Sequence, residues 1–228
     1  MSQTESHYEI KQFGNEKEPI VIIDNFSGQV QFLRSQAINA HYKPAGVGYP
    51  GVRADADSFY LGIRRQLLSD IVQEVFAFKH GAIYESCTFS IVTTPPDELA
   101  PAQRIPHYDD TGDHVLAALH YINGSEMDGT SFYRHRRTGF ESVTPERADT
   151  YRHALSADEQ EFGPPEVGYM YGDTARYEMI GDIPAKPDRM IIYRGRTLHS
   201  GSISASFEPI ADPAKGRVTI NTFLIKQS

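Results

Sequence analysis

Most of the chain beyond residue 82 is a series of short segments that are either apolar or alternate between apolar and polar side chains. Glycine, proline and aspartate separate these segments, and their backbone preferences end strands and form turns. We expect strands over residues 87–91, 115–123, 130–134, 176–180, 190–194 and 218–225. The segment 115–123 is apolar on both faces, as in a strand that is buried on both sides. Such a series of strands predicts a sandwich or a barrel.

The first third of the chain adds helices to this pattern. Residues 20–23 are a β-branched run that predicts one more strand. Apolar residues then recur at helical spacing over 30–41 and again over 58–78, on either side of a turn-rich loop at 44–51. We therefore predict an α+β protein, mainly β, in which N-terminal helices cover a sheet.

The size and composition are those of one globular domain. The chain has 228 residues, of which 39% are hydrophobic and 23% are charged. We expect a single domain over 1–228, with a polar lead-in at 1–19 and an insertion between strands at 136–169 that begins a helix near Thr144 and Pro145.

Charge and cysteine content exclude several classes of function. The net charge of −8 argues against a nucleic-acid binder, and no apolar run is long enough to predict a membrane helix. The N-terminus carries no secretory pattern, so we expect a cytoplasmic protein. One cysteine excludes an internal disulfide and a cysteine zinc site, whereas nine histidines allow a metal held by nitrogen and oxygen.

Three residues could form such a metal site. His107 and Asp109 are two positions apart and would share a face of an extended segment. His199 follows the strand 190–194 and a glycine turn. Two histidines and one carboxylate are the facial triad of non-haem Fe(II) enzymes, which leaves coordination positions open. A His-x-Asp pair beside Pro106 also fits an ordinary surface loop.

The last strand could bind a carboxylate. Arg217, Thr219 and Asn221 share one face of it, and an apolar core face lies opposite. A guanidinium binds a carboxylate through two parallel hydrogen bonds, and a hydroxyl can add a third. An edge strand with its polar face in water explains this pattern equally well.

Taken in order, His107-x-Asp109, the distant His199 and Arg217-x-Thr219 resemble the 2-oxoglutarate/Fe(II)-dependent oxygenase superfamily. The segments 20–27, 119–123 and 128–132 are similar to its prolyl-4-hydroxylase-like branch, and the likeness is strongest to a bacterial family within it. The resemblance covers about residues 20–227. It implies a double-stranded β-helix, or jelly roll, with Fe(II) held by His107, Asp109 and His199.

The resemblance also implies a place for the co-substrate. The far carboxylate of 2-oxoglutarate would meet Arg217, Thr219 and Tyr121. Because the interval from His199 to Arg217 is longer than usual, Arg196 and Arg194 are alternatives to Arg217. Related halogenases carry a small residue in place of Asp109, so its presence implies a hydroxylase.

The resemblance therefore implies hydroxylation of an unactivated C–H bond in a small polar molecule, amino acid or peptide, with release of succinate and CO2. Arginines expected near the barrel mouth suggest an anionic or zwitterionic substrate. They are Arg134, Arg136, Arg137, Arg176, Arg194 and Arg196. His135 lies between Arg134 and Arg136, and we expect it in solvent or facing the substrate. We expect neither nucleic acid nor membrane as a partner, and the sequence leaves a homodimer open. The alternative is a non-catalytic jelly-roll protein that binds a ligand or another protein.

Overall fold

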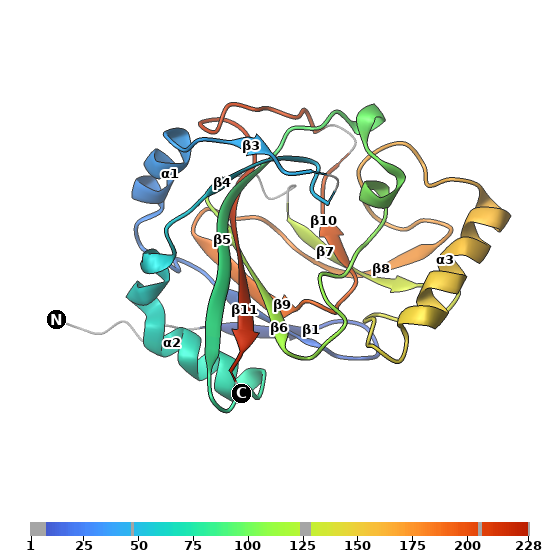
Figure 1. The fold of residues 1–228 in the computed structure, drawn as a ribbon, viewed down its shortest axis with the longest axis horizontal. Coiled ribbons are helices and arrows are strands. Elements are labelled where there is room, and N and C mark those ends of the chain that lie inside the picture. Colours follow the sequence, from blue (N-terminus) through green and yellow to red (C-terminus); the bar gives the residue numbers. More distant parts are fainter. Residues whose placement is uncertain (1–7, 47, 124–128, 205–206, 228) are drawn as a thin grey trace.

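The computed structural model of the protein describes residues 8–46, 48–123, 129–204 and 207–227, and it is mostly β (Figure 1). All strand pairs are antiparallel, and they form two sheets. The larger sheet has the order β1 (Glu9–Gln12), β2 (Pro19–Ile23), β9 (Arg189–Arg194), β6 (Val115–Tyr121), β11 (Val218–Lys226), β5 (Ala82–Val92), β4 (Gly51–Asp55), β3 (Lys43–Pro44). The smaller sheet has the order β10 (His199–Gly201), β7 (Thr130–His135), β8 (Tyr177–Ile183).

All seven segments that the sequence predicts as strands are strands, within a few residues at their ends. Four further strands were not predicted. β1 lies within the polar lead-in, and β3 and β10 have only two and three residues. β4 begins at the last glycine of the predicted loop at 44–51, and its apolar residues Val52 and Ala54 alternate with Arg53 and Asp55.

One face of the larger sheet packs against the N-terminal helices α1 (Val30–Ile38) and α2 (Arg65–Asp70). Leu33 and Ala37 of α1 and Leu68 of α2 share a core cluster with strand residues such as Ile192 and Ile220. Each large apolar side chain that is fully buried in this way contributes about 1.5–3 kcal/mol. The predicted helix 58–78 is not one regular helix. It consists of a 3₁₀ helix η1 (Ser58–Arg64), then α2, then a π-helical turn η2 (Ile71–Val75).

The other face of the larger sheet meets the smaller sheet. Ile20 and Ile22 of β2 belong to a second cluster with Phe132 of β7 and Tyr193 of β9. Val21 and Ile23 of the same strand face the helices instead, because successive side chains of a strand point to opposite faces. Apolar side chains fill only part of the space between the two sheets. The candidate site lies in the remaining space.

The 136–169 insertion contains α3 (Ala148–Phe162), which lies beside the smaller sheet, on the side of the molecule opposite α1 (Figure 1). The helix begins after the predicted Thr144 and Pro145 and ends at Gly163, whose φ of +76° suits glycine. Tyr151 packs with Tyr177 and Leu198 of the sheet side. Two short 3₁₀ turns, η3 (Pro96–Glu98) and η4 (Pro101–Arg104), precede residues 107–109. Within the described ranges, no helix has the length and apolarity to cross a membrane.

Candidate metal centre

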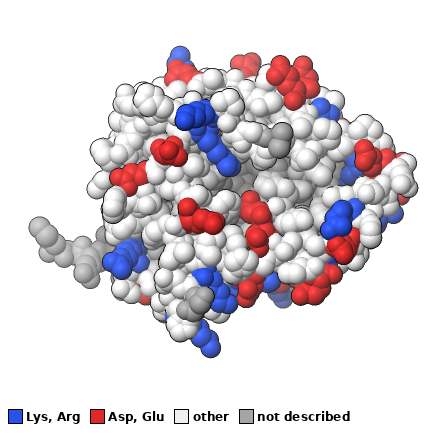
Figure 2. Space-filling model, in the orientation of Figure 1, with Lys and Arg blue, Asp and Glu red and all other residues white. Residues whose placement is uncertain are grey.

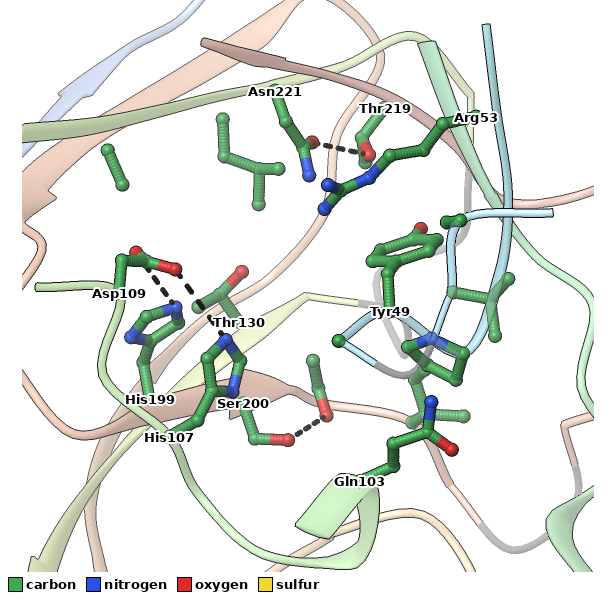
Figure 3. Close-up of a pocket in the computed structure, with 18 of the residues that line it drawn as sticks. Tyr49, Arg53, Gln103, His107, Asp109, Thr130, His199, Ser200, Thr219 and Asn221 are labelled. Atoms are coloured by element: carbon green, nitrogen blue, oxygen red, sulfur yellow. Dashed lines mark hydrogen bonds and ion pairs between the residues drawn. The ribbon is translucent and has the colours of Figure 1, made fainter. Parts of the chain in front are cut away.

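His107, Asp109 and His199 converge because two backbone segments pair (Figure 3). The N–H of His107 donates to the carbonyl of His199, and the reverse bond is also made, each at 2.9 Å. The N–H of Asp109 then donates to the carbonyl of Gly195 at 2.7 Å. The loop that carries His107 and Asp109 is thus tied to the turn before β10 and to β10 itself.

The ligand atoms of the three side chains all lie within 4.8 Å of one another. Asp109 Oδ1 is 3.8 Å from His107 Nε2, and Asp109 Oδ2 is 3.7 Å from His199 Nε2. The Nδ1 of His199 lies 2.8 Å from the carbonyl oxygen of Thr197. A carbonyl only accepts, so this nitrogen carries the proton and the lone pair of Nε2 points toward Asp109. Such an outer hydrogen bond is the usual way to orient a metal-binding histidine.

The surroundings keep both imidazoles neutral. Loss of hydration inside the cavity, followed by the closeness of His199, lowers the pKa of His107 to about 4, against a weaker opposing effect of Asp109. Burial likewise lowers the pKa of His199 to about 4. Burial raises the pKa of Asp109. A divalent cation would reverse the last effect, because it favours the ionised carboxylate. At neutral pH the two histidines therefore present lone pairs without first having to lose a proton.

The three side chains form one wall of a cavity of about 490 Å³. The side chain of His107 is 52% exposed, whereas that of His199 is 7% exposed. The group is therefore held from behind and open toward the cavity. Figure 2 shows the surface hollowed near the centre of this face of the molecule. The volume lies in the range of small-molecule sites.

The predicted polar face of the last strand lines the same cavity. Arg217, Thr219, Asn221 and Phe223 all contribute to it. Arg217 is only 6% exposed, and its Nη2 donates to the carbonyl of Gly129 at 3.0 Å. Thr219 Oγ1 donates to Asn221 Oδ1 at 2.9 Å (Figure 3). The structure thus brings Arg217 and Thr219 to the cavity that the histidines line.

Tyr121 lies behind the residues that line the cavity. It is fully buried and is not among the residues that line the cavity. Its hydroxyl is 2.7 Å from Thr130 Oγ1, and Thr130 does line the cavity. The guanidinium of Arg217 lies 5.8 Å from the centre of the Tyr121 ring. Tyr121 therefore reaches the cavity through Thr130 and Arg217 in this conformation. Asp128, in the segment that resembles the family, lies outside the described residues.

The arginines singled out from the sequence are elsewhere. Arg196, one alternative to Arg217, forms an ion pair with Glu18 at 2.5 Å, and Arg194, the other, reaches the same carboxylate at 3.2 Å. Acidic partners also hold Arg134, Arg136 and Arg137, while Arg176 donates to the carbonyl of Gly163. None of these six arginines lines the cavity.

Several polar residues of the cavity were missed from the sequence, among them Tyr49, Arg53, Gln103 and Tyr169. Arg53 was missed because no element was predicted between the loop at 44–51 and the helix at 58–78, although the alternation Val52, Arg53, Ala54, Asp55 was a usable strand signal. Tyr169 comes from the end of the insertion, and its hydroxyl donates to the carbonyl of Thr94 at 2.6 Å. No local pattern predicts that contact between distant segments.

Comparison with known proteins gives a family and a fold. The sequence matches the "Family of unknown function (DUF6445)" over residues 4–224, and a search of curated proteins found no match. Among solved structures, the non-heme alpha ketoglutarate dependent epimerase SnoN from nogalamycin biosynthesis is 12% identical, with a TM-score of 0.51 over 92% of this chain and 80% of that one.

Two further structures have lower scores. The non-heme alpha ketoglutarate dependent carbocyclase SnoK from nogalamycin biosynthesis is 14% identical, with a TM-score of 0.48 over 92% of this chain and 81% of that one. An N-substituted L-amino acid dioxygenase from Burkholderia ambifaria AMMD is 13% identical, with a TM-score of 0.45 over 98% and 97% of the two chains. At these identities the likeness to SnoN shows a shared fold and nothing about the reaction.

Proposed function

The chain belongs to the family of unknown function DUF6445, and from its site we propose that it is an Fe(II)- and 2-oxoglutarate-dependent oxygenase. We propose further that it hydroxylates an unactivated C–H bond of a small molecule, amino acid or peptide. The observation that carries this proposal is the group His107, Asp109 and His199, open toward a cavity whose other wall carries Arg217. The fold shared with SnoN is consistent with it.

The donor set fits iron. Two neutral imidazoles and one carboxylate on one side of a cavity are the ligands that non-haem Fe(II) oxygenases use, and they leave the cavity side of the ion open. The hydrogen bond from His199 Nδ1 to Thr197 fixes the tautomer that a ligand needs. His107, Asp109 and His199 would hold the ion.

The opposite wall fits the far carboxylate of 2-oxoglutarate. Arg217 is buried and faces the cavity beside Thr219, so a carboxylate there would gain a charge-assisted pair and a hydroxyl donor away from water. Tyr121 can support this end through Thr130, to which its hydroxyl is bonded. Arg217 is preferred over Arg196, because Arg217 lines the cavity and Arg196 does not.

The bound ion and co-substrate would supply the oxidising chemistry, in which 2-oxoglutarate and dioxygen give succinate and CO2, with one oxygen atom going to succinate and the other to the substrate as a hydroxyl group. The protein's own part is orientation and exclusion of water. His107 and His199 present fixed lone pairs, Arg217 and Thr219 set the direction of the co-substrate, and Tyr169 closes part of the wall by its bond to Thr94.

Two finer assignments belong to the same proposal. We assign the two antiparallel sheets to a double-stranded β-helix, with α1 and α2 covering its larger sheet and the 136–169 insertion shaping the cavity within a single domain. We also place the chain in the prolyl-4-hydroxylase-like branch. The order of the site residues along the sequence supports both assignments.

The test is formation of succinate from 2-oxoglutarate with Fe(II) and oxygen, with and without candidate substrates. We expect His107→Ala and Asp109→Ala to abolish it. His114→Ala and Asp110→Ala are matched controls, since the side chain of His114 is 52% exposed, as is that of His107, and Asp110 neighbours Asp109, but neither control belongs to the group of three. A non-catalytic binding protein is the alternative. Wild-type protein that forms no succinate under any of these conditions would favour it.

A further inference from the structure

The cavity contains a second arginine that the proposed reaction does not use. Arg53 lies on β4 directly opposite Ser90 of β5, which in turn lies opposite Thr219 of β11. Side chains of directly opposed residues share a face of the sheet, so Arg53 enters the cavity from the same row as Thr219. Figure 3 shows its side chain extending into the cavity beside Tyr49.

Arg53 is held in place, but no carboxylate of the described residues pairs with it. Its guanidinium lies 4.6 Å from the centre of the Tyr49 ring, which gives it a fixed position through a cation–π contact. Its Nε atom is buried and has no hydrogen-bond partner among the described residues. None of the ion pairs between described residues includes Arg53. By contrast, five other arginines each pair with a carboxylate, namely Arg134, Arg136, Arg137, Arg194 and Arg196. Buried donors are normally satisfied, so this one points to a ligand.

The two arginines of the cavity have separate positions. Arg217 is tied to the carbonyl of Gly129 and lies near the ring of Tyr121. Arg53 lies over the ring of Tyr49, which is in the turn before β4. In the larger sheet, β4 and β6, the strand of Tyr121, lie on opposite sides of β11. Figure 3 shows the Arg53 side chain in the same cavity as His107, Asp109 and His199, reaching in from the side of Thr219.

The charged side chains of the described lining have distinct roles in the proposed reaction. Asp109 is the only carboxylate among the described residues that line the cavity, and Arg53 and Arg217 are the only arginines among them. The ion and Arg217 would meet the two carboxylates of 2-oxoglutarate. Arg53 is then available for an anionic group of another molecule.

There is also room for a second molecule. A cavity of about 490 Å³ corresponds to roughly 16 water molecules at about 30 Å³ each, which is more than 2-oxoglutarate alone needs. Its lining includes apolar and aromatic side chains, among them Val92, Tyr169 and Ile203.

We propose that Arg53 binds a carboxylate of the substrate and that the pocket takes a small monocarboxylic acid with an apolar body. This inference rests on the proposed function, and it deepens it by naming the substrate class. A guanidinium suits this role because its planar fork matches a carboxylate, and the Tyr49 ring holds the fork in one orientation.

The test has two parts, both without oxygen. First, 2-oxoglutarate is titrated into the Fe(II) protein, with its weak visible charge-transfer band as the readout, for wild type, Arg53→Gln, Arg53→Lys and Arg217→Gln. We expect Arg53→Gln to keep the co-substrate Kd within about threefold of wild type and Arg217→Gln to raise it by at least about tenfold. Equal losses in both variants would assign Arg53 to the co-substrate and overturn the proposal.

Second, calorimetry of the Fe(II) and 2-oxoglutarate complex measures binding of monocarboxylic acids of increasing size, each paired with its primary amide. We expect at least one acid to bind about tenfold more tightly than its amide, Arg53→Gln to erase that preference, and Arg53→Lys to retain part of it. Lys43→Gln, which removes an exposed positive charge opposite Arg53 on β3, should leave the preference intact.

The proposal is wrong if no acid binds better than its amide, or if the preference survives Arg53→Gln. Absence of the band in wild type would instead refute the proposed function, and the inference would fail with it.

Discussion

Replacement of Asp188 by asparagine should lower the free energy of unfolding by about 2 kcal/mol. Asp188 is 4% exposed and directly precedes β9. Its Oδ1 accepts hydrogen bonds from the backbone N–H and the hydroxyl of Ser27, at 2.9 and 2.6 Å, and from His120 Nε2 at 3.0 Å. Its Oδ2 accepts from the N–H of Gly28 at 2.8 Å. An asparagine would turn an amide group toward donors that need an acceptor.

The magnitude follows from the pKa of the carboxyl. Burial alone would raise this pKa, but the hydrogen bonds from His120 and Ser27 outweigh it and lower the pKa of Asp188 from 3.8 to about 2. A difference of one pH unit between the folded and unfolded pKa corresponds to about 1.4 kcal/mol. Because the folded pKa is depressed, this stability is fully present above about pH 4 and is lost as the pH falls toward 2.

Asp24 is the matched control. Hydrogen bonding to Arg189 lowers the pKa of Asp24 to about 2 as well, but its side chain is 37% exposed. Solvent screening should therefore leave Asp24→Asn with a loss below about 1 kcal/mol, which diminishes further in high salt. The loss in Asp188→Asn should not depend on salt.

The assay is urea denaturation of the three proteins at pH 7, in low and high salt. An NMR titration of the carboxyl carbons checks the pKa directly. The reasoning is refuted if Asp188→Asn lies within about 0.5 kcal/mol of wild type, if the two variants behave alike, or if Asp188 titrates near pH 4.

Three further predictions concern the site and its supports. Gly129→Ala should lower the melting temperature and weaken 2-oxoglutarate binding, because a Cβ there would lie 2.0 Å from the carbonyl oxygen of Ile183 and would displace the carbonyl that Arg217 contacts. Gly62→Ala is the control, because a Cβ at Gly62 meets open space, and it should change neither the melting temperature nor 2-oxoglutarate binding. Equal effects of Gly129→Ala and Gly62→Ala would contradict the role given to Gly129. Tyr121→Phe and Thr130→Val should each raise the 2-oxoglutarate Kd by a similar factor, since the two hydroxyls bond each other. The double variant should raise the Kd by little more than either single variant. Additive effects of the two substitutions would show that the residues act independently. Asp158→Asn should lower the free energy of unfolding, measured by urea denaturation, by about 2 kcal/mol or more, because Asp158 pairs with buried His135 and with Arg137. Asp149→Asn, on the exposed face of α3, is the control. Equal losses in the two variants would contradict a special role of Asp158.

The strands and the metal-site residues were accessible from the sequence because their signals are local. Alternation along the chain placed His107 and Asp109 on one side, and it assigned Arg217 and Thr219 to the face of β11 that lines the cavity. That these two groups meet across a cavity depends on the pairing of His107 with His199, which no local pattern contains. The resemblance to a family supplied the order of residues that suggested it.

The histidines show where local reasoning failed. His135 was expected in solvent or facing the substrate because three arginines flank it, yet it is fully buried, lies outside the cavity lining and is bonded to Asp158 of α3. Arg137 shares Asp158 with His135, while Arg134 and Arg136 pair with carboxylates outside α3. The burial of His135 depends on α3, whose packing against the smaller sheet could not be predicted from the strand pattern. Arg53 was missed for the opposite reason, since its short strand does carry a local signal.

The central claim is that His107, Asp109 and His199 bind Fe(II) and leave room for 2-oxoglutarate held at Arg217. Its most direct test is an anaerobic titration of the metal-free protein with Fe(II) and then 2-oxoglutarate, monitored in the visible range. We expect a weak charge-transfer band that saturates at one co-substrate per chain and is absent in His199→Ala but present in His114→Ala. The account would be contradicted if wild type gave no band, or if His199→Ala gave the same band.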